Sequence, residues 1–140
     1  MPEKYEFAGM RILIIEDMID NAKLLAKITE KHKLETAVAY EGLKGFDMVS
    51  EFNPDLILLD IGLPDTDGFE ICSRLKSENR FKDIPVIFIT AYTESSSVVK
   101  GFELGAVDYI AKPFRAAEVI SRISNQLRLR KFQRELISRP

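Results

Sequence analysis

Short apolar runs alternate along the chain with longer stretches in which apolar residues recur every three or four positions. The apolar runs have the length and residue types of strands buried in a sheet, and they cover residues 11–15, 35–39, 56–59, 85–89 and 107–111. The three-to-four spacing predicts amphipathic helices. We expect these helices at residues 19–31, around 43–49, at 68–77, around 98–102, and from about 115 to 138.

The order of these elements predicts an α/β fold. Strand and helix alternate five times with short connections, which is typical of a parallel sheet with helices on both faces. For five strands we expect the doubly wound, flavodoxin-like order 2-1-3-4-5. In that order the first and third strands are neighbours, and their carboxyl ends meet where such sheets bind ligands.

Polar residues follow four of the predicted strands directly. Glu16 and Asp17 follow the first strand, and Asp60 follows the third. Thr90 ends the fourth strand and Lys112 follows the fifth. Asp60 alone would also suit a helix cap or a loop carboxylate, because such caps are common. Together, the five residues are expected to meet in one crevice at the carboxyl edge of the sheet.

Three clustered carboxylates repel one another unless they share a proton or a cation. With no cysteine or histidine beside them, they suit Mg²⁺, which takes carboxylates, waters and phosphate oxygens. Thr90 and Lys112 would supply a hydroxyl and an ammonium to a phosphoryl group, and Asp60 can itself be the nucleophile that forms an aspartyl phosphate. Phosphoryl transfer needs little more than positioning and charge neutralisation. The sequence therefore predicts a Mg²⁺-dependent phosphoryl site.

Composition places limits on the class of protein. The chain has 140 residues, of which 46% are hydrophobic and 30% charged, which suits one globular domain. The net charge of −2 offers no reason to expect nucleic acid as a partner. No apolar run is long enough to span a bilayer, so we expect no membrane partner. The polar N-terminus lacks the apolar core of a signal peptide, so we expect a cytoplasmic protein.

Two other residues with reactive side chains are expected to have no chemical role. Cys72 is the single cysteine, so an internal disulfide is excluded, and its helical spacing from Leu75 predicts a buried thiol. His32 stands between Lys31 and Lys33 near a helix end, and we expect it at the surface without a cluster of zinc ligands.

The motifs along the chain resemble those of the receiver domains of two-component response regulators, such as the bacterial chemotaxis response protein. The resemblance covers about residues 11–127. The motifs that carry it are Glu16-Asp17, Asp60 with Leu63-Pro64 and Gly68, Thr90-Ala91, Tyr109, and Lys112-Pro113-Phe114. Each motif is weak alone, but their order and their positions at the strand ends are specific.

The resemblance implies a role for each of these residues. Asp60 would accept a phosphoryl group from a sensor histidine kinase or a histidine phosphotransfer protein. The residues that would hold Mg²⁺ are Glu16, Asp17, Asp60 and, through its backbone carbonyl, Gly62. Thr90 and Lys112 would bind the phosphoryl group, Tyr109 would move with Thr90, and the Lys112–Pro113 bond would be cis. The protein would be a signalling phosphoacceptor rather than an enzyme.

The same resemblance implies a switch surface. It would be formed by the helix around residues 98–102, the strand 107–111 and the last helix, and a partner or a second copy of the chain would dock there. The departures from the family are Leu63 and Thr66 at positions that often carry methionine. Neither touches the proposed chemistry, although Thr66 would make the contact between loop and helix less apolar.

Three rival functions fit the residues less well. A phosphatase of the haloacid dehalogenase kind needs a second acid two residues after the nucleophile, where this chain has Gly62. A nucleotide or flavin binder needs glycine in the turn after the first strand, where residues 16–20 instead carry three acids. A receiver that has lost phosphorylation would lack a required side chain, and none is missing.

The chain divides into a loose leader at residues 1–9, a receiver domain at 10–127 and a helical extension at 128–140. The extension is basic, with Arg128, Arg130, Lys131, Arg134 and Arg139. We expect a solvated helix, which can connect to an output domain beyond residue 140. The apolar residues Leu129, Phe132 and Leu136 would suit pairing with a second helix, although they span too little for a coiled coil. No nucleic-acid recognition motif is present, so we expect no direct nucleic-acid binding.

Overall fold

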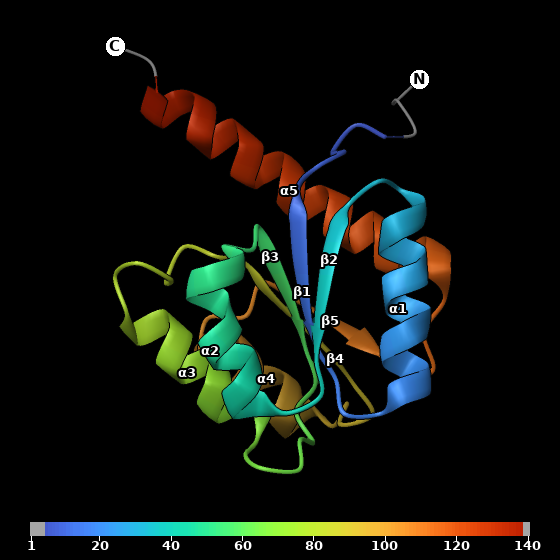
Figure 1. Cartoon of the computed structure of the whole chain (residues 1–140). Coiled ribbons are helices and arrows are strands. Elements are labelled where there is room, and N and C mark those ends of the chain that lie inside the picture. Colours follow the sequence, from blue (N-terminus) through green and yellow to red (C-terminus); the bar gives the residue numbers. More distant parts are fainter. Residues whose placement is uncertain (1–4, 139–140) are drawn as a thin grey trace.

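The computed structural model describes residues 5–138 and has the alternating strands and helices that the sequence predicts (Figure 1). The strands are β1 (Arg11–Ile15), β2 (Glu35–Ala39), β3 (Leu56–Leu59), β4 (Val86–Thr90) and β5 (Asp108–Ala111). The helices are α1 (Ile19–Lys31), α2 (Gly42–Phe52), α3 (Gly68–Ser77), α4 (Ser95–Glu103) and α5 (Ala116–Ser138). Residues 1–4 of the predicted leader, and Arg139, lie outside the described residues.

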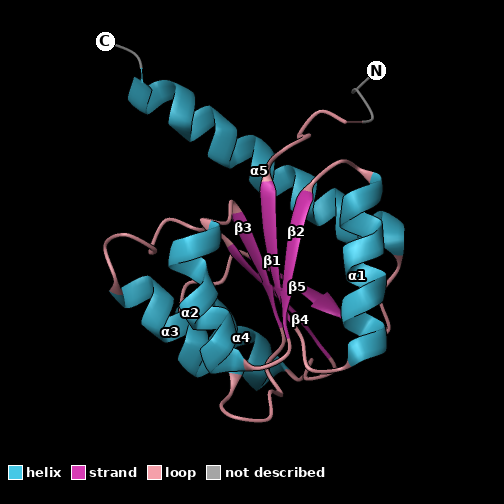
Figure 2. Ribbon diagram, viewed as in Figure 1, coloured by secondary structure: helices cyan, strands magenta, loops and turns pink. Residues whose placement is uncertain are grey.

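All five strands are parallel, and their order is β2-β1-β3-β4-β5, which confirms the prediction. The strands form the middle layer and the helices cover both faces (Figure 2). In the register, Ile15 of β1 pairs with Leu59 of β3, so the residues that follow these two strands start at the same level. Thr90 pairs with Ala111 in the same way. The sheet thus brings the predicted site residues to one edge.

Each face of the sheet has its own hydrophobic core, because successive side chains of a strand point to opposite faces. One core contains Leu13, Ile57 and Phe88 and packs against α2 and α3. The other contains Ile14, Leu58, and Val119 and packs against α1 and α5. Because the central strands are buried on both faces, they read as unbroken apolar runs in the sequence.

Several local expectations differ from the structure at the helix starts. The N-cap of α1 is Met18, without a side-chain hydrogen bond, although aspartate is a common capping residue and Asp17 and Asp20 stand on either side of it. Asp17 stands before the cap and groups with the other acids, while Asp20 lies within the first turn. Ile19 and Leu43, the apolar residues that begin the predicted helices at 19–31 and around 43–49, are 56% and 43% exposed. Both stand in the first turns of their helices, beside the carboxyl edge of the sheet.

Residues 5–9 pack against the domain instead of forming a loose leader. Phe7 is buried in the second core, and the Arg128 guanidinium lies over its ring at 5.5 Å from the centroid. The Gly9 N–H donates to the Lys33 carbonyl at 2.9 Å. A buried aromatic residue therefore anchors this segment. The predicted domain boundaries themselves stay a prediction.

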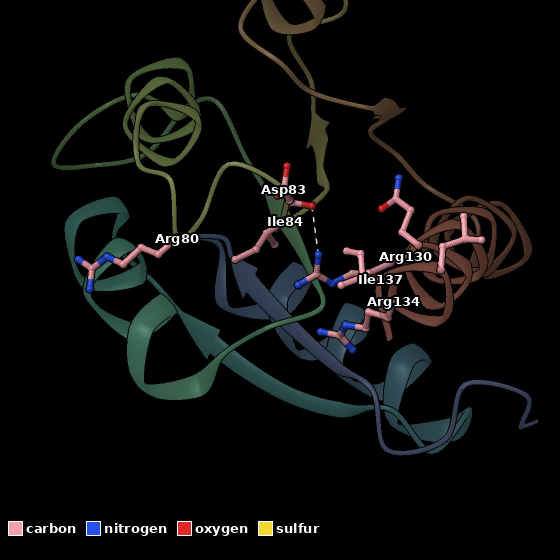
Figure 3. A pocket seen from close by; sticks show the side chains of 8 residues that line it. Arg80, Asp83, Ile84, Arg130, Arg134 and Ile137 are labelled. Atoms are coloured by element: carbon pink, nitrogen blue, oxygen red, sulfur yellow. Dashed lines mark hydrogen bonds between the residues drawn. The ribbon is translucent and has the colours of Figure 1, made fainter. Parts of the chain in front are cut away.

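Helix α5 continues without a break through the predicted boundary at residue 127, as its apolar spacing suggested. Its second half projects past the edge where the strands begin (Figure 1). Two arginines hold it there. Arg134 contacts the buried Asp55 carboxylate at 2.6 Å. Arg130 donates to the Asp83 carbonyl at 3.1 Å (Figure 3). They line a hollow of about 510 Å³ at the edge opposite the predicted site.

The remaining sequence predictions concern single residues and membrane segments. Cys72 is buried, as predicted, and burial raises the pKa of its thiol. His32 is half-buried, with Nδ1 3.2 Å from the Ile28 carbonyl oxygen, and it belongs to no metal-binding group among residues 5–138. In the part of the chain that the structure describes, none of the helices has the length and apolarity needed to cross a membrane.

Candidate functional site

The hydrogen-bonded ladder of the sheet extends one residue past β1 and β3 and fixes the backbone of two carboxylates. The Glu16 N–H donates to the Ala39 carbonyl at 3.0 Å, and the Asp60 N–H donates to the Ile15 carbonyl at 3.0 Å. On the other side of the site, the Lys112 N–H donates to the Thr90 carbonyl at 3.0 Å. All of these positions are therefore set by strand pairing rather than by flexible loops.

The three predicted acids converge. Glu16, Asp17 and Asp60 each offer a carboxylate oxygen, and these oxygens lie within 4.8 Å of one another. Glu16 and Asp60 are buried, and Asp17 is partly exposed. The Gly62 N–H donates to Asp60 Oδ1 at 3.3 Å. The donors are all hard oxygen atoms, without nitrogen or sulfur, so the residues present fit Mg²⁺.

Lys112 lies between two of these acids. Its Nζ is 2.6 Å from Asp60 Oδ2 and 2.5 Å from Glu16 Oε1. The sequence predicted Lys112 as a donor to a phosphoryl group, and the structure shows that it also neutralises the carboxylates. The lysine stem is half-buried, and the peptide bond that follows it, Lys112–Pro113, is cis, as the resemblance implied.

The protonation of the site follows from burial and from this lysine. Burial, helped by the Asp60 charge, raises the pKa of Glu16 to about 7, although Lys112 opposes the shift. Burial also acts to raise the pKa of Asp60, but hydrogen bonds from Lys112 and Thr90 outweigh it and lower that pKa. Burial acts to lower the pKa of Lys112, but the hydrogen bonds to Asp60 and Glu16 outweigh burial, and the pKa of Lys112 is raised. Near neutral pH, Asp60 is therefore ionised, while Glu16 is close to half-protonated.

Thr90 and Tyr109 are joined through Tyr92, a link that the sequence did not indicate. The buried Thr90 hydroxyl accepts a hydrogen bond from the Tyr92 N–H at 3.3 Å, and the Tyr109 hydroxyl donates to the Tyr92 carbonyl at 2.9 Å. The Tyr109 ring packs on Phe88 with centroids 5.6 Å apart. Burial, with the charges of Glu94 and Asp60, raises the pKa of Tyr109 to about 12, so its hydroxyl stays a donor.

The Tyr92 ring lies beside Gly62. A Cβ added to Gly62 would stand 3.0 Å from Tyr92 Cε2, and the ring is 49% exposed. The ring therefore lies over Gly62, two residues after Asp60. Tyr92 stands two residues after Thr90 and Gly62 two residues after Asp60, the positions expected from the family's geometry to flank the phosphorylation site.

Comparison with known proteins gives the chain a family. The family model described as the response regulator receiver domain matches residues 12–124. The match begins at the second residue of β1 and includes β2 to β5 and helices α1 to α4.

Curated relatives and solved structures agree with the family model. The chain is 39% identical to the DNA-binding dual master transcriptional regulator RpaA of Synechocystis, over 84% of this chain and 49% of RpaA. It is 36% identical to the DNA-binding response regulator MtrA of Mycobacterium tuberculosis, over 84% of this chain and 50% of MtrA. The crystal structure of a putative response regulator from Chloroflexus aurantiacus matches with a TM-score of 0.81 and 31% identity, over 85% and 98% of the two chains. The chain spans about half the length of the curated relatives it matches.

The names of these relatives correct one expectation. We expected no direct nucleic-acid binding, and that expectation is wrong, because both relatives are named as DNA-binding proteins. It rested on a net charge of −2 averaged over the chain and on the lack of a recognition motif. An average charge cannot describe a local surface such as the basic second half of α5.

The raised pKa of Glu16 predicts how metal-free stability depends on pH. Because the folded-state pKa of about 7 exceeds the ordinary value of 4.5, the folded state holds this proton more tightly than the unfolded state. The free energy of unfolding should therefore fall as pH rises from 4.5 to 7, by on the order of 2 kcal/mol. Urea denaturation in EDTA at pH 5 and pH 8 measures it. Glu16→Gln should abolish most of this fall, and a variant with the same fall as wild type would contradict the assignment.

Proposed function

The chain belongs to the response regulator receiver domain family, and from that premise we propose that it accepts a phosphoryl group on Asp60 with the help of Mg²⁺. The observation that carries the proposal is the meeting, at the carboxyl edge of the sheet, of three carboxylates with oxygens within 4.8 Å of one another and an ammonium group that contacts two of them. The donor would be a phosphohistidine on a sensor histidine kinase or a histidine phosphotransfer protein.

Asp60 is suited to be the nucleophile. Its lowered pKa keeps it ionised, and its two oxygens are oriented by the Gly62 N–H and by Lys112. In the transfer, a carboxylate oxygen of Asp60 forms a bond to phosphorus as the bond between phosphorus and the histidine nitrogen breaks. The imidazole leaves with the electron pair of that bond.

The other residues neutralise the charge that the phosphoryl group brings. Glu16, Asp17 and Asp60 would hold Mg²⁺, with the Gly62 carbonyl as the resemblance implies, and the bound ion would supply positive charge to the phosphoryl oxygens. Lys112 can turn from the carboxylates to a phosphoryl oxygen while it stays within reach of Asp60. The Thr90 hydroxyl, at the end of β4, can donate a hydrogen bond to another phosphoryl oxygen.

The switch in this proposal begins at Thr90. When the Thr90 hydroxyl turns toward a phosphoryl oxygen, the hydrogen bond that it accepts from the Tyr92 N–H changes. The Tyr92 carbonyl in turn accepts a hydrogen bond from the Tyr109 hydroxyl, so the change can reach Tyr109. Tyr109 packs against Phe102 of α4 with centroids 6.3 Å apart. The exposed face formed by α4, β5 and α5, which includes Val99 and Phe102, is where a partner or a second copy of the chain would dock.

The shape of the surface beside the site suits a protein as the donor of the phosphoryl group. A hollow of about 360 Å³ lies between α1 and the segment that follows β5. It is lined by Met18, Asn21, Leu24, Lys112, Pro113 and Phe114. A donor seated there would bring its phosphohistidine next to Lys112.

On this proposal the chain is a signalling phosphoacceptor rather than an enzyme, and it works in the cytoplasm. The names of its relatives extend the role of the whole protein to gene regulation.

Phosphorylation should require Asp60. Incubation with acetyl phosphate and Mg²⁺ should add a labile phosphoryl mass to the wild type, and Asp60→Asn should abolish it because the amide is a poor nucleophile. Intact-mass spectrometry measures both. Asp55→Asn changes a buried carboxylate at the opposite end of β3 and should still be phosphorylated. An Asp60→Asn protein that gains the mass as fully as wild type would exclude Asp60 as the acceptor.

The phosphorylated state should last for many minutes rather than seconds. Hydrolysis needs a water aligned opposite the leaving carboxylate, and a carboxamide or carboxylate beside the site could orient it. Gly62 has no side chain, and the Tyr92 ring beside it is bulky. Gly62→Asn and Tyr92→Glu should therefore each shorten the lifetime, measured as loss of phosphoprotein after donor removal. Tyr5→Glu, a change remote from Asp60, should not. Decay of the wild type within seconds, or no acceleration in either variant, would show that these positions do not set the lifetime.

A further inference from the structure

The loop of residues 61–67, between β3 and α3, is bound to the start of α2 by one side chain. Asp65 Oδ1 accepts from the Gly42 N–H at 2.8 Å, and Oδ2 accepts from the Leu43 N–H at 2.9 Å. These bonds, the Leu43 bond first, lower the pKa of Asp65. The side chain of Glu41, the N-cap residue of α2, makes no capping hydrogen bond, and the first turn has no acidic residue. Asp65 therefore caps a helix that begins 23 residues before it in the chain.

The same loop packs closely on α2 beside this bond. A Cβ added to Gly42 would stand 2.5 Å from Thr66 Cγ2 and 3.1 Å from Leu63 Cδ1. The absence of a side chain at Gly42 is what gives the loop room. Thr66, which we expected to make the contact between loop and helix less apolar, places its methyl group in that contact. In Figure 1 the loop lies at the bottom of the view, below the sheet.

The other side of the loop holds Asp60. The Gly62 N–H donates to Asp60 Oδ1 at 3.3 Å. The loop is closed on itself, because Gly62 and Asp67 form an antiparallel bridge and the Gly68 N–H donates to the Ile61 carbonyl at 2.8 Å. A displacement of the loop at Asp65 would therefore move Gly62 as well.

From these contacts we propose that Asp65 is a positioning residue for the phosphorylation site. By binding the start of α2, it fixes the loop whose Gly62 N–H orients the Asp60 carboxylate, and so it sets the affinity of the site for Mg²⁺ and the rate at which Asp60 is phosphorylated. This inference rests on the proposed function for its metal and its reaction. The geometry that it invokes, from Asp65 through Gly62 to Asp60, exists in the metal-free protein.

Asp67 provides a matched control in the same loop. Its Oδ1 accepts from the Glu70 N–H at 2.8 Å and caps α3. Asp67→Ala therefore removes the same charge and one helix cap, but it leaves the link to α2 intact. Asp65→Asn keeps one acceptor oxygen and should lie between wild type and Asp65→Ala.

The experiment follows the Gly62 amide by NMR in protein labelled with ¹⁵N-glycine. The chain has seven glycines, so the spectrum contains few signals. The Gly62 signal is assigned by its absence in Gly62→Ala. Without metal, Asp65→Ala should shift this signal, and Asp67→Ala, which keeps the backbone bridge between residue 67 and Gly62, should shift it by less. On titration with MgCl₂, Asp65→Ala should bind about tenfold more weakly than wild type, as expected when a group that orients a metal ligand is lost. Phosphorylation by acetyl phosphate at subsaturating Mg²⁺ should slow in parallel.

The outcomes separate this inference from the proposed function. A wild type that neither binds Mg²⁺ nor is phosphorylated would refute the proposed function, and the metal-free Gly62 signal would still decide whether Asp65 orients the loop. If the wild type binds Mg²⁺ and Asp65→Ala binds it equally well, the inference is wrong. The inference is also wrong if Asp65→Ala and Asp67→Ala shift the Gly62 signal and weaken Mg²⁺ binding by the same amounts. Such a result would mean that the loss of a negative charge from the loop, and not the loss of the link to α2, causes the effect.

Discussion

The Lys112 ammonium lies between the carboxylates of Glu16 and Asp60, and the rest of the site depends on this contact. Three carboxylates held within 4.8 Å would otherwise repel one another in a largely buried position. When all three carboxylates are ionised, the one ammonium group leaves two negative charges, which a divalent cation would match. The fold makes the contact possible because β1, β3 and β5 are parallel and end at the same edge. On the proposed function, the residues that would hold a metal ion and a phosphoryl group are therefore already side by side in the unmodified protein.

Most of the fold could be predicted from the sequence because its sheet is buried on both faces. Runs such as residues 56–59 have no polar position, and this separates them clearly from the amphipathic helices. The five candidate side chains could be found for a related reason, since a polar residue directly after such a run must stand at the edge of the sheet. The errors fall at the helix starts. Periodicity shows which side chains share a face, but it cannot show that Ile19 and Leu43 lie beyond the neighbouring elements that would cover them.

The side-chain network could not be predicted, because it joins residues that are far apart in the chain and carry no common pattern. Asp65 binds the start of α2, Tyr109 binds the Tyr92 carbonyl, and Arg134 binds Asp55. Each partner alone has the ordinary features of a turn or surface residue. These bonds depend on how the layers pack, and they connect the site to its surroundings: Asp65 to the loop that orients Asp60, and Tyr109 to the face of α4 and β5.

The most direct test of the central claim is a crystal structure of the protein with Mg²⁺ and beryllofluoride, which mimics a phosphoryl group on a carboxylate. The account predicts beryllium bonded to an Asp60 oxygen, with Lys112 Nζ and Thr90 Oγ1 each contacting a fluorine. It also predicts Mg²⁺ bound by Glu16, Asp17 and Asp60, and a changed position of Tyr109. Beryllofluoride on another carboxylate, or Mg²⁺ bound without these three acids, would contradict the account.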